Sequence, residues 1–224
     1  LLIVAMLVAV SSPSLQAQQR SPEPTTKTGT LVGIEQEGRV RTLRIKDDAG
    51  EEQSLALTPK IQAYVEAPGD ASFLRPGQFI AALATESNKQ LFAKEVTVVP
   101  VGKGRPPVGK IQKAPKTSGQ SVNAYQVTGT INTIGPDTDY PEYQRVDVKA
   151  AGPKAPLMLE EGFKVTVRLK DFSLAPEGTP IEIQGHEFRN GRFVVAKVVA
   201  KLEEPIDASK VFGEAEEGQP AAEK

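Results

Sequence analysis

The sequence predicts an all-β protein that contains two tandem, small, OB-like β-barrel domains. The first observation behind this prediction is that apolar and polar residues alternate over short stretches, as they do in strands of a half-buried sheet. The second is that the 224-residue chain holds 19 glycines and 18 prolines, which favours short elements separated by turns. The third is that the same landmarks occur twice, about 100 residues apart.

Three landmarks recur in the same order. Thr28-Gly29-Thr30-Leu31 returns as Thr128-Gly129-Thr130-Ile131, and Leu74-Arg75-Pro76 returns as Leu174-Ala175-Pro176. Near the end of the first copy, Phe92-Ala93-Lys94-Glu95-Val96 corresponds to Val195-Ala196-Lys197-Val198-Val199 in the second. Two copies at this spacing indicate tandem domains, which we place at residues 28–99 and 124–202.

Each copy is expected to form a small set of strands joined by short turns. In the first copy the strands are expected at 29–34, 39–46, 53–57, 61–65, 77–84 and 91–99, with one helical turn at 70–74. In the second copy they are expected at 125–134, 143–149, 157–159, 164–169, 179–184 and 192–202. Asn190-Gly191 is the strongest hairpin signal, because both residues tolerate the positive φ of a type I′ turn.

The order of these landmarks resembles a family of uncharacterised bacterial exported domains that often occur in tandem. The matching residues are Gly29-Thr30-Leu31 with Leu74-Arg75-Pro76-Gly77 in the first copy. In the second copy they are Gly129-Thr130-Ile131 with Leu174-Ala175-Pro176-Glu177-Gly178, which has one inserted residue. The resemblance implies an OB-like barrel for each copy and supplies no catalytic residues.

The N-terminus indicates export. Residues 1–10 are all apolar, and a zone ending near Ala17 follows with the small residues of a signal-peptide cleavage site. We therefore expect a signal peptide at 1–17, a disordered segment at 18–27, and a mature protein in the periplasm, cell envelope or extracellular space. The alternative is a buried strand or helix of the mature fold. Ten apolar residues are too few for a membrane span, so none is expected in the mature chain.

Two segments outside the repeats carry opposite charge. The linker at 100–123 is rich in Pro and contains five basic residues and no acidic one: Lys103, Arg105, Lys110, Lys113 and Lys116. It is either a solvated spacer or a basic strip that contacts an anionic polymer. The tail at 203–224 is acidic and is expected to be disordered.

The sequence offers no catalytic residues and no cofactor-binding or metal-binding motif. The chain has no cysteine and a single histidine, His186, so thiolate chemistry and any mechanism that needs two imidazoles are excluded. Asp137, Asp139 and Glu142 could ligate calcium through loop oxygens, but an Asp-rich turn needs no ion. With 27 basic and 28 acidic residues, the balance of charge disfavours nucleic acid as a partner.

Binding is the remaining class of function. OB-type barrels hold ligands between the loop joining strands 1 and 2 and the loop joining strands 4 and 5. In the second copy these places hold Tyr140, Tyr143 and Arg145, with Asn190 and Arg192 opposite. We therefore expect a non-enzymatic interaction or structural module of the cell envelope, with a protein partner. The alternative is an OB-type receptor for an oligosaccharide or other anionic polymer, which stacks on these tyrosines.

Overall fold

The computed structural model describes residues 24–38, 40–101, 106–115, 123–188 and 192–213. Within these residues strands predominate and helical segments are few and short, so the all-β prediction is confirmed. The strands are β1 (Pro24–Glu37), β2 (Val40–Asp47), β3 (Glu52–Leu57), β4 (Gln62–Gly69), β5 (Phe79–Ser87), β6 (Gln90–Val99), β7 (Lys110–Lys113), β8 (Ala124–Pro136), β9 (Gln144–Lys149), β10 (Leu157–Leu169), β11 (Pro180–Glu187) and β12 (Phe193–Lys201). Two 3-10 turns, η1 (Ala71–Phe73) and η2 (Phe172–Leu174), and one helix, α1 (Ala208–Phe212), complete the described elements.

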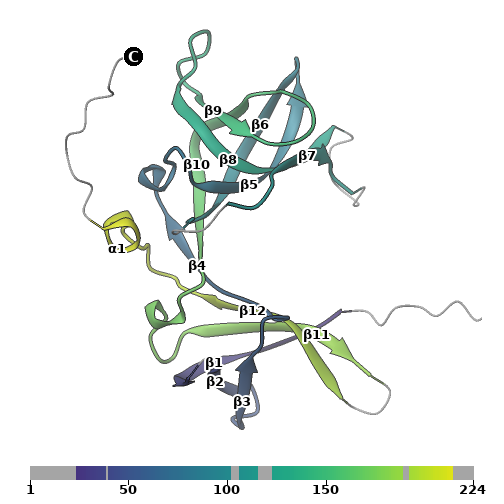
Figure 1. Ribbon diagram of the computed structural model, residues 1–224, viewed down its shortest axis with the longest axis vertical. Helices are drawn as coiled ribbons and strands as arrows, with labels where there is room; N and C mark the ends of the chain where they lie inside the picture. Colours follow the sequence, from purple (N-terminus) through teal and green to yellow (C-terminus); the bar gives the residue numbers. More distant parts are fainter. Residues whose placement is uncertain (1–23, 39, 102–105, 116–122, 189–191, 214–224) are drawn as a thin grey trace, which may run out of the picture.

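Five strands close into a barrel, which forms the upper part of the molecule in Figure 1. β8 pairs with β9, β9 with β10, β10 with β6, β6 with β5, and β5 pairs with β8 again. Four of these pairs are antiparallel and the β6·β10 pair is parallel. Because the ring returns to its first strand, each of its strands has a neighbour on both sides, and we call it the closed barrel.

Six further strands form a curved sheet in the order β3-β2-β1-β11-β12-β4, which is the lower part of Figure 1. This sheet does not return to its first strand, and we call it the open half. In the described residues β3 pairs with β2 alone, and residues 193–196 of β12 pair with β11 alone. The gap between β3 and these four residues is called the seam below. β4 also pairs with β10, which joins the open half to the closed barrel.

The two halves of the molecule do not correspond to the two sequence repeats. The β5–β6 hairpin of the first repeat completes the closed barrel with β8, β9 and β10 of the second. In return, the β11–β12 hairpin of the second repeat pairs with β1 and β4 of the first. The sequence predicted that residues 28–99 and 124–202 would each form a barrel alone, and the pairing shows instead that the repeats exchange their last two strands.

The exchange is allowed because both hairpins present the same register to their partners. Ile80 lies opposite Gly129, and Ile181 lies opposite Gly29. Each glycine faces a crowded position, since a Cβ on Gly29 would lie 2.6 Å from the carbonyl oxygen of Lys46. Either hairpin therefore matches either first strand. This explains why a sequence that repeats itself cannot reveal from local signals which pairing forms.

Each repeat has a 3-10 turn that buries one aromatic side chain. The Asp70 side chain accepts a hydrogen bond from the Ser72 N–H (2.9 Å) and begins η1, while Asp171 does the same for Ser173 (3.0 Å) at η2. Phe73 and Phe172, at equivalent positions in the repeats, are both buried. The hydrogen bond from the Ser173 N–H lowers the pKa of Asp171, because it stabilises the carboxylate.

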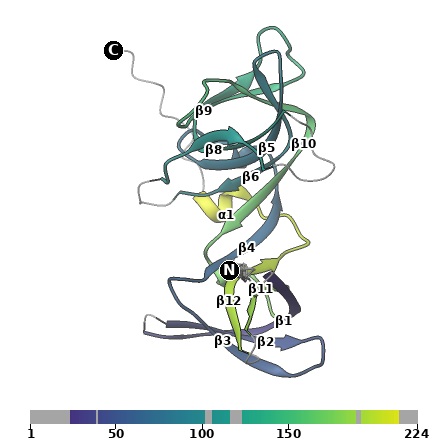
Figure 2. The ribbon, with the colours of Figure 1, turned by 90° about the vertical axis from the view of Figure 1, so that its right-hand side faces the viewer.

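The segments flanking the repeats are more ordered than the sequence suggested. Part of the predicted linker forms β7, which pairs with β8 and buries Ile111. The predicted disordered tail continues in order to residue 213, with Ile206 buried and Phe212 of α1 packed against Phe73 (ring centroids 5.6 Å apart). Figure 2 shows α1 beside the strands that join the two halves.

The N-terminal predictions lie largely outside the described residues. The expected signal peptide at 1–17 and residues 18–23 are not described, as is the case for linker residues 102–105 and 116–122. Residues 24–27, which were expected to be disordered, form the first part of β1 opposite β11. Among the described residues, no helix has the length and apolar character needed to cross a bilayer.

Candidate ligand-binding site on the closed barrel

The loop between β8 and β9 is organised by the buried carboxylate of Asp137. This side chain is 4% exposed, and its Oδ1 accepts hydrogen bonds from the N–H groups of Asp139 (3.0 Å) and Tyr140 (3.1 Å). The Asp137 N–H donates to the Tyr143 carbonyl oxygen (3.0 Å), and the Tyr143 N–H donates to that of Tyr140 (2.9 Å). These four hydrogen bonds fix the shape of the loop.

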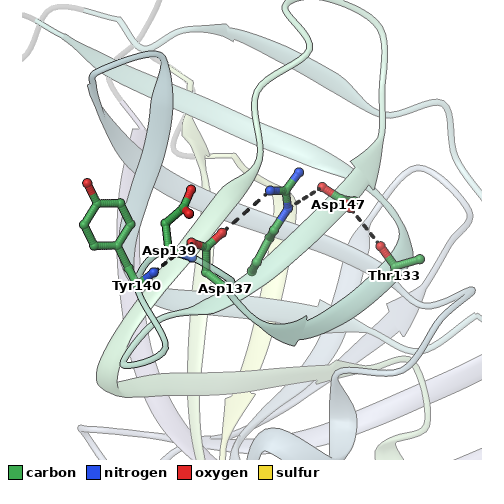
Figure 3. Close-up of polar contacts among 6 residues, drawn as sticks. Thr133, Asp137, Asp139, Tyr140 and Asp147 are labelled. Atoms are coloured by element: carbon green, nitrogen blue, oxygen red, sulfur yellow. Dashed lines mark hydrogen bonds and ion pairs between the residues drawn. The ribbon is translucent and has the colours of Figure 1, made fainter.

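A chain of polar contacts connects this loop to the barrel wall (Figure 3). Arg145 Nη1 lies 3.6 Å from Asp137 Oδ2, and Arg145 Nε donates to Asp147 Oδ1 at 3.3 Å. Thr133 Oγ1 donates to the other oxygen of Asp147 at 2.9 Å. The Arg145 side chain is held at two points and remains 45% exposed, so its charge is fixed in place and accessible.

Three aromatic rings meet beside this network. Tyr143 makes edge-to-face contacts with Phe92 (ring centroids 5.5 Å apart) and with Tyr140 (6.4 Å). Tyr143 begins the turn into β9 while Phe92 lies on β6, so the contact crosses β10, which runs between these strands. Tyr140 is 48% exposed and is the outermost ring of this aromatic cluster.

Met158 lies beneath the aromatic cluster. Its neighbours Leu157 and Leu159 belong to the barrel core, so strand alternation turns Met158 to the outer face. Its cross-strand partners are Phe92 on β6 and Arg145 on β9, and it is nevertheless fully buried. Because Met158 is fully buried although it faces outward, it packs under the aromatic cluster and restricts the movement of the rings.

A groove extends from the aromatic cluster over β5, β6 and β8. It has a volume of about 970 Å³, and Phe92 is the member of the aromatic cluster that lines it. Small and polar side chains line most of it, including Thr85, Thr97, Gln126 and Thr128. Charge is also present, because Lys94 forms an ion pair with Glu160 (3.5 Å). The arrangement combines stacking surfaces, hydrogen-bonding groups and a fixed cation, which suits a polar ligand with flat faces.

The structure brings together three of the five predicted site residues. Tyr140 and Tyr143 lie on the β8–β9 loop of the closed barrel, and Arg145 lies beside them near the start of β9. Arg192 lies in the β11–β12 connection, which belongs to the open half, and Asn190 lies outside the described residues. Because the repeats exchange hairpins, the loop predicted to face the tyrosines sits on the other half of the molecule.

The loop that takes this place is the β5–β6 turn of the first repeat. Asn88 and Lys89 form a two-residue connection between Ser87 and Gln90, and both have positive φ (49° and 63°). Sequence reasoning missed this turn and also missed Phe92 and Met158 as site residues. Phe92 was visible only as a repeat landmark, and no local signal assigns it to a barrel with Tyr143.

No cluster of three His, Cys, Asp or Glu side chains suited to a metal ion occurs among the described residues. Asp137 and Asp139 were considered for calcium, and the Asp137 oxygens are engaged by the loop N–H groups and by Arg145. His186 lies on β11 opposite Pro24 and Val194, in the open half and away from the aromatic cluster.

Comparison with known proteins identified no relative of this chain. No protein-family description matches the chain, no curated protein matches it, and no solved structure matches its fold. The site is therefore interpreted from its own chemistry.

Proposed function

We propose that the protein is a non-enzymatic, exported tandem OB-like protein that acts as an interaction module of the cell envelope. The observation that carries the proposal is the aromatic cluster of Tyr140, Tyr143 and Phe92, whose two tyrosines lie on the β8–β9 loop, the equivalent of one of the two loops that OB-type barrels use to hold ligands. Two features support the OB-like assignment: five strands close into a ring, and a short 3-10 turn precedes the last hairpin of each repeat. Membership of the exported tandem family remains part of this proposal.

Export and the lack of an enzymatic role rest on the sequence. The apolar run at 1–10 supports a signal peptide, and a chain with one histidine and no cysteine has neither a thiolate nucleophile nor a pair of imidazoles. Binding suits the site chemistry, because the Arg145 guanidinium is paired with the carboxylates of Asp137 and Asp147.

The second candidate function is a receptor for an oligosaccharide or other anionic polymer. The exposed ring of Tyr140, the neighbouring Arg145 and the groove that Phe92 lines favour it. Sugar rings stack on aromatic faces, and hydroxyl groups bond to Thr and Gln side chains of the kind that line the groove.

Affinity capture from envelope extract, with the wild-type chain and with Tyr140→Ala, tests the proposal. Tyr140 is the right residue to change, because Tyr143 packs on Phe92 and Arg145 holds the buried Asp137, so altering either would disturb the loop. We expect Tyr140→Ala to retain the folded circular-dichroism spectrum and to lose the captured partner by about tenfold, the value of one anchoring aromatic side chain.

Salt dependence separates the two candidates. A protein retained at high salt by the wild type and lost by Tyr140→Ala supports the interaction module. A polysaccharide that is released as salt rises supports the receptor. Equal capture by the wild type and Tyr140→Ala contradicts both, because neither candidate then uses the aromatic cluster.

A further inference from the structure

The seam is the place where the open half lacks a contact that the closed barrel has. In the closed barrel, residues 157–159 of β10 pair in parallel with residues 91–93 of β6. Val96 on β6 lies opposite Val165 on β10, and in the open half Val198 on β12 lies opposite Ala63 on β4. Val198 thus corresponds to Val96 and Val165 to Ala63, each pair being 102 residues apart in the sequence. The same offset makes 55–57 of β3 and 193–195 of β12 the corresponding stretches, and these do not pair with each other.

The missing contact leaves apolar side chains partly open. Leu91, Ala93, Leu157 and Leu159 are all at most 2% exposed in the closed barrel. Their counterparts Leu55, Leu57, Phe193 and Val195 are only half-buried. Val194 (40% exposed) and Phe188 (49% exposed) add large apolar surface beside β12. Apolar side chains gathered along one gap are costly to leave in water, and they indicate a surface made to be covered.

The backbone at the seam offers hydrogen bonds on two sides. Among the described residues, β3 has one unpaired edge along 52–57, and β12 has one unpaired edge along 193–196. A segment that binds between β3 and β12 must form backbone hydrogen bonds along both of its edges. A strand that already belongs to another sheet has at most one free edge, so it cannot do this. A single extended segment fits this requirement, and a sheet edge from a second copy of the chain does not.

The seam also continues a ladder that already exists. β12 pairs in parallel with β4 through residues 197–201, and the unpaired stretch 193–196 precedes it directly. An extended segment bound at the seam would therefore prolong the β12 ladder in the same direction as β4.

The charge at the seam favours an acidic occupant. The ammonium group of Lys27 lies 4.6 Å from the centre of the Phe193 ring, and Lys27 itself is exposed. Lys197 lies at the point where the paired part of β12 begins, 5.5 Å from the centre of the Tyr64 ring. In the closed barrel the position equivalent to Lys27 is held by the buried, apolar Val127, so this positive charge is particular to the open half.

We propose that the seam binds an extended segment of a partner protein by strand addition. The segment presents apolar residues at two alternate positions toward Leu55, Leu57, Phe193 and Val195, and an acidic residue beyond them toward Lys27. This site lies in the open half, so it goes beyond the ligand site on the closed barrel and does not depend on it.

The probe is a synthetic peptide with the sequence of residues 154–162, Lys-Ala-Pro-Leu-Met-Leu-Glu-Glu-Gly. It is chosen because β10 uses this stretch for the parallel contact that the seam lacks. Fluorescence anisotropy of the labelled peptide with the full chain measures affinity, and hydrogen exchange of the complex locates the site. We expect saturable binding, with exchange slowed by about tenfold or more at residues 53–57 and 193–196 only.

Two matched controls test the chemistry. A peptide with serine in place of both leucines keeps length and charge, and we expect its affinity to fall at least tenfold because it no longer buries apolar side chains. The exposed position of Lys27 makes Lys27→Glu safe for folding, and we expect about fivefold weaker binding that recovers when lysine replaces both glutamates of the peptide. Tyr140→Ala should bind the peptide as the wild type does, which separates this test from that of the aromatic cluster.

Several results would overturn the proposal. The first is no saturable binding of the probe, and the second is equal binding of the serine peptide. The third is protection at residues 91–93, which would mean that the peptide displaces β10 from the closed barrel. The fourth is exchange at residues 193–196 of the free chain as slow as at 91–93, because the seam would then already be closed.

Discussion

The closed barrel and the open half are built from the same repeat, yet only one of them closes. The difference lies in the four residues after the third strand of each repeat. In the closed barrel these are residues 160–163, where Gly162 (φ +72°) forms a bulge that lets β10 continue. In the open half they are residues 58–61, where Pro59 lacks an N–H and the Ile61 N–H donates to the Thr58 carbonyl oxygen (3.0 Å).

This comparison shows that closure is decided locally. A bulge lets one strand stay paired with its parallel neighbour on both sides of the irregularity, with a shift in register at the bulge, whereas a turn splits the strand into β3 and β4. Leu159 is consequently fully buried, and its counterpart Leu57 is half-buried. Similar sequence in the strands was not sufficient to give similar packing.

Truncation of these two leucines should give the largest difference between the halves. We expect Leu159→Ala to lower the free energy of unfolding by about 2–5 kcal/mol, because it leaves a cavity in a packed core. Leu57→Ala should cost roughly half as much or less, since part of that side chain is already in water. Urea denaturation of both variants measures the contrast, and equal losses would mean that the open half is as closely packed as the barrel.

Introducing the bulge sequence into the open half should close the seam, as the corresponding contact is closed in the closed barrel. Replacement of Thr58-Pro59-Lys60-Ile61 by Glu-Glu-Gly-Phe gives the first repeat the bulge sequence of the second. We expect β3 to continue into β4, and the amides of residues 193–196 to exchange about tenfold more slowly as β3 pairs with them. Unchanged exchange in a folded variant would show that the seam is held open by something other than this turn.

A smaller effect concerns an ion pair that occurs only in the open half. Lys201 Nζ donates to Glu182 Oε2 (2.5 Å), whereas the corresponding position of the closed barrel is Ala81. The hydrogen bond from Lys201, followed by that from Gln184, lowers the pKa of Glu182 below its ordinary value of 4.5. The contribution of Glu182 to stability is therefore complete above about pH 4.5 and is lost as the pH falls through the lowered pKa of the folded state.

Glu182→Gln tests this pH dependence. Because Lys201 is about half exposed, we expect a loss of less than about 1 kcal/mol at pH 7 that shrinks toward zero in acid. Urea denaturation of the wild type and the variant at pH 7 and at about pH 3 makes the comparison. A difference that stays constant between these pH values would contradict the assignment of the effect to the carboxylate charge.

The sequence was sufficient for local features of this fold and insufficient for long-range ones. Alternation and turn residues predicted the all-β class, the repeat and most strand positions. The Asp-rich turn predicted that Tyr140, Tyr143 and Arg145 would lie close together, at the β8–β9 loop and the start of β9. The exchange of hairpins was not predictable, because Gly29 and Gly129 accept either hairpin in the same register. That ambiguity also explains why Arg192 was assigned to the wrong side of the site and why Phe92 was missed.

The remaining differences arose where a short segment gains order from its neighbours. β7 has only four residues, and its pairing with β8 and the burial of Ile111 stabilise it. α1 has five residues, and its position depends on the contact of Phe212 with Phe73. Such segments are too short to show a period of their own, so composition alone marked them as linker and tail.

The measurement that tests the exchanged arrangement most directly is disulfide cross-linking in this cysteine-free chain. Leu83 on β5 lies opposite Gln126 on β8, and both side chains are exposed. If each repeat formed its own barrel, the residue opposite Leu83 would instead be Thr26, the counterpart of Gln126. Directly opposed residues of antiparallel strands have Cα atoms about 4.5–5.5 Å apart, within reach of a disulfide.

Two double variants are therefore oxidised at low protein concentration and compared by mobility under non-reducing conditions. We predict an intramolecular disulfide in Leu83→Cys with Gln126→Cys and none in Leu83→Cys with Thr26→Cys. The reverse result, with cross-linking to position 26, would contradict the exchange of hairpins and the composition of the closed barrel that follows from it.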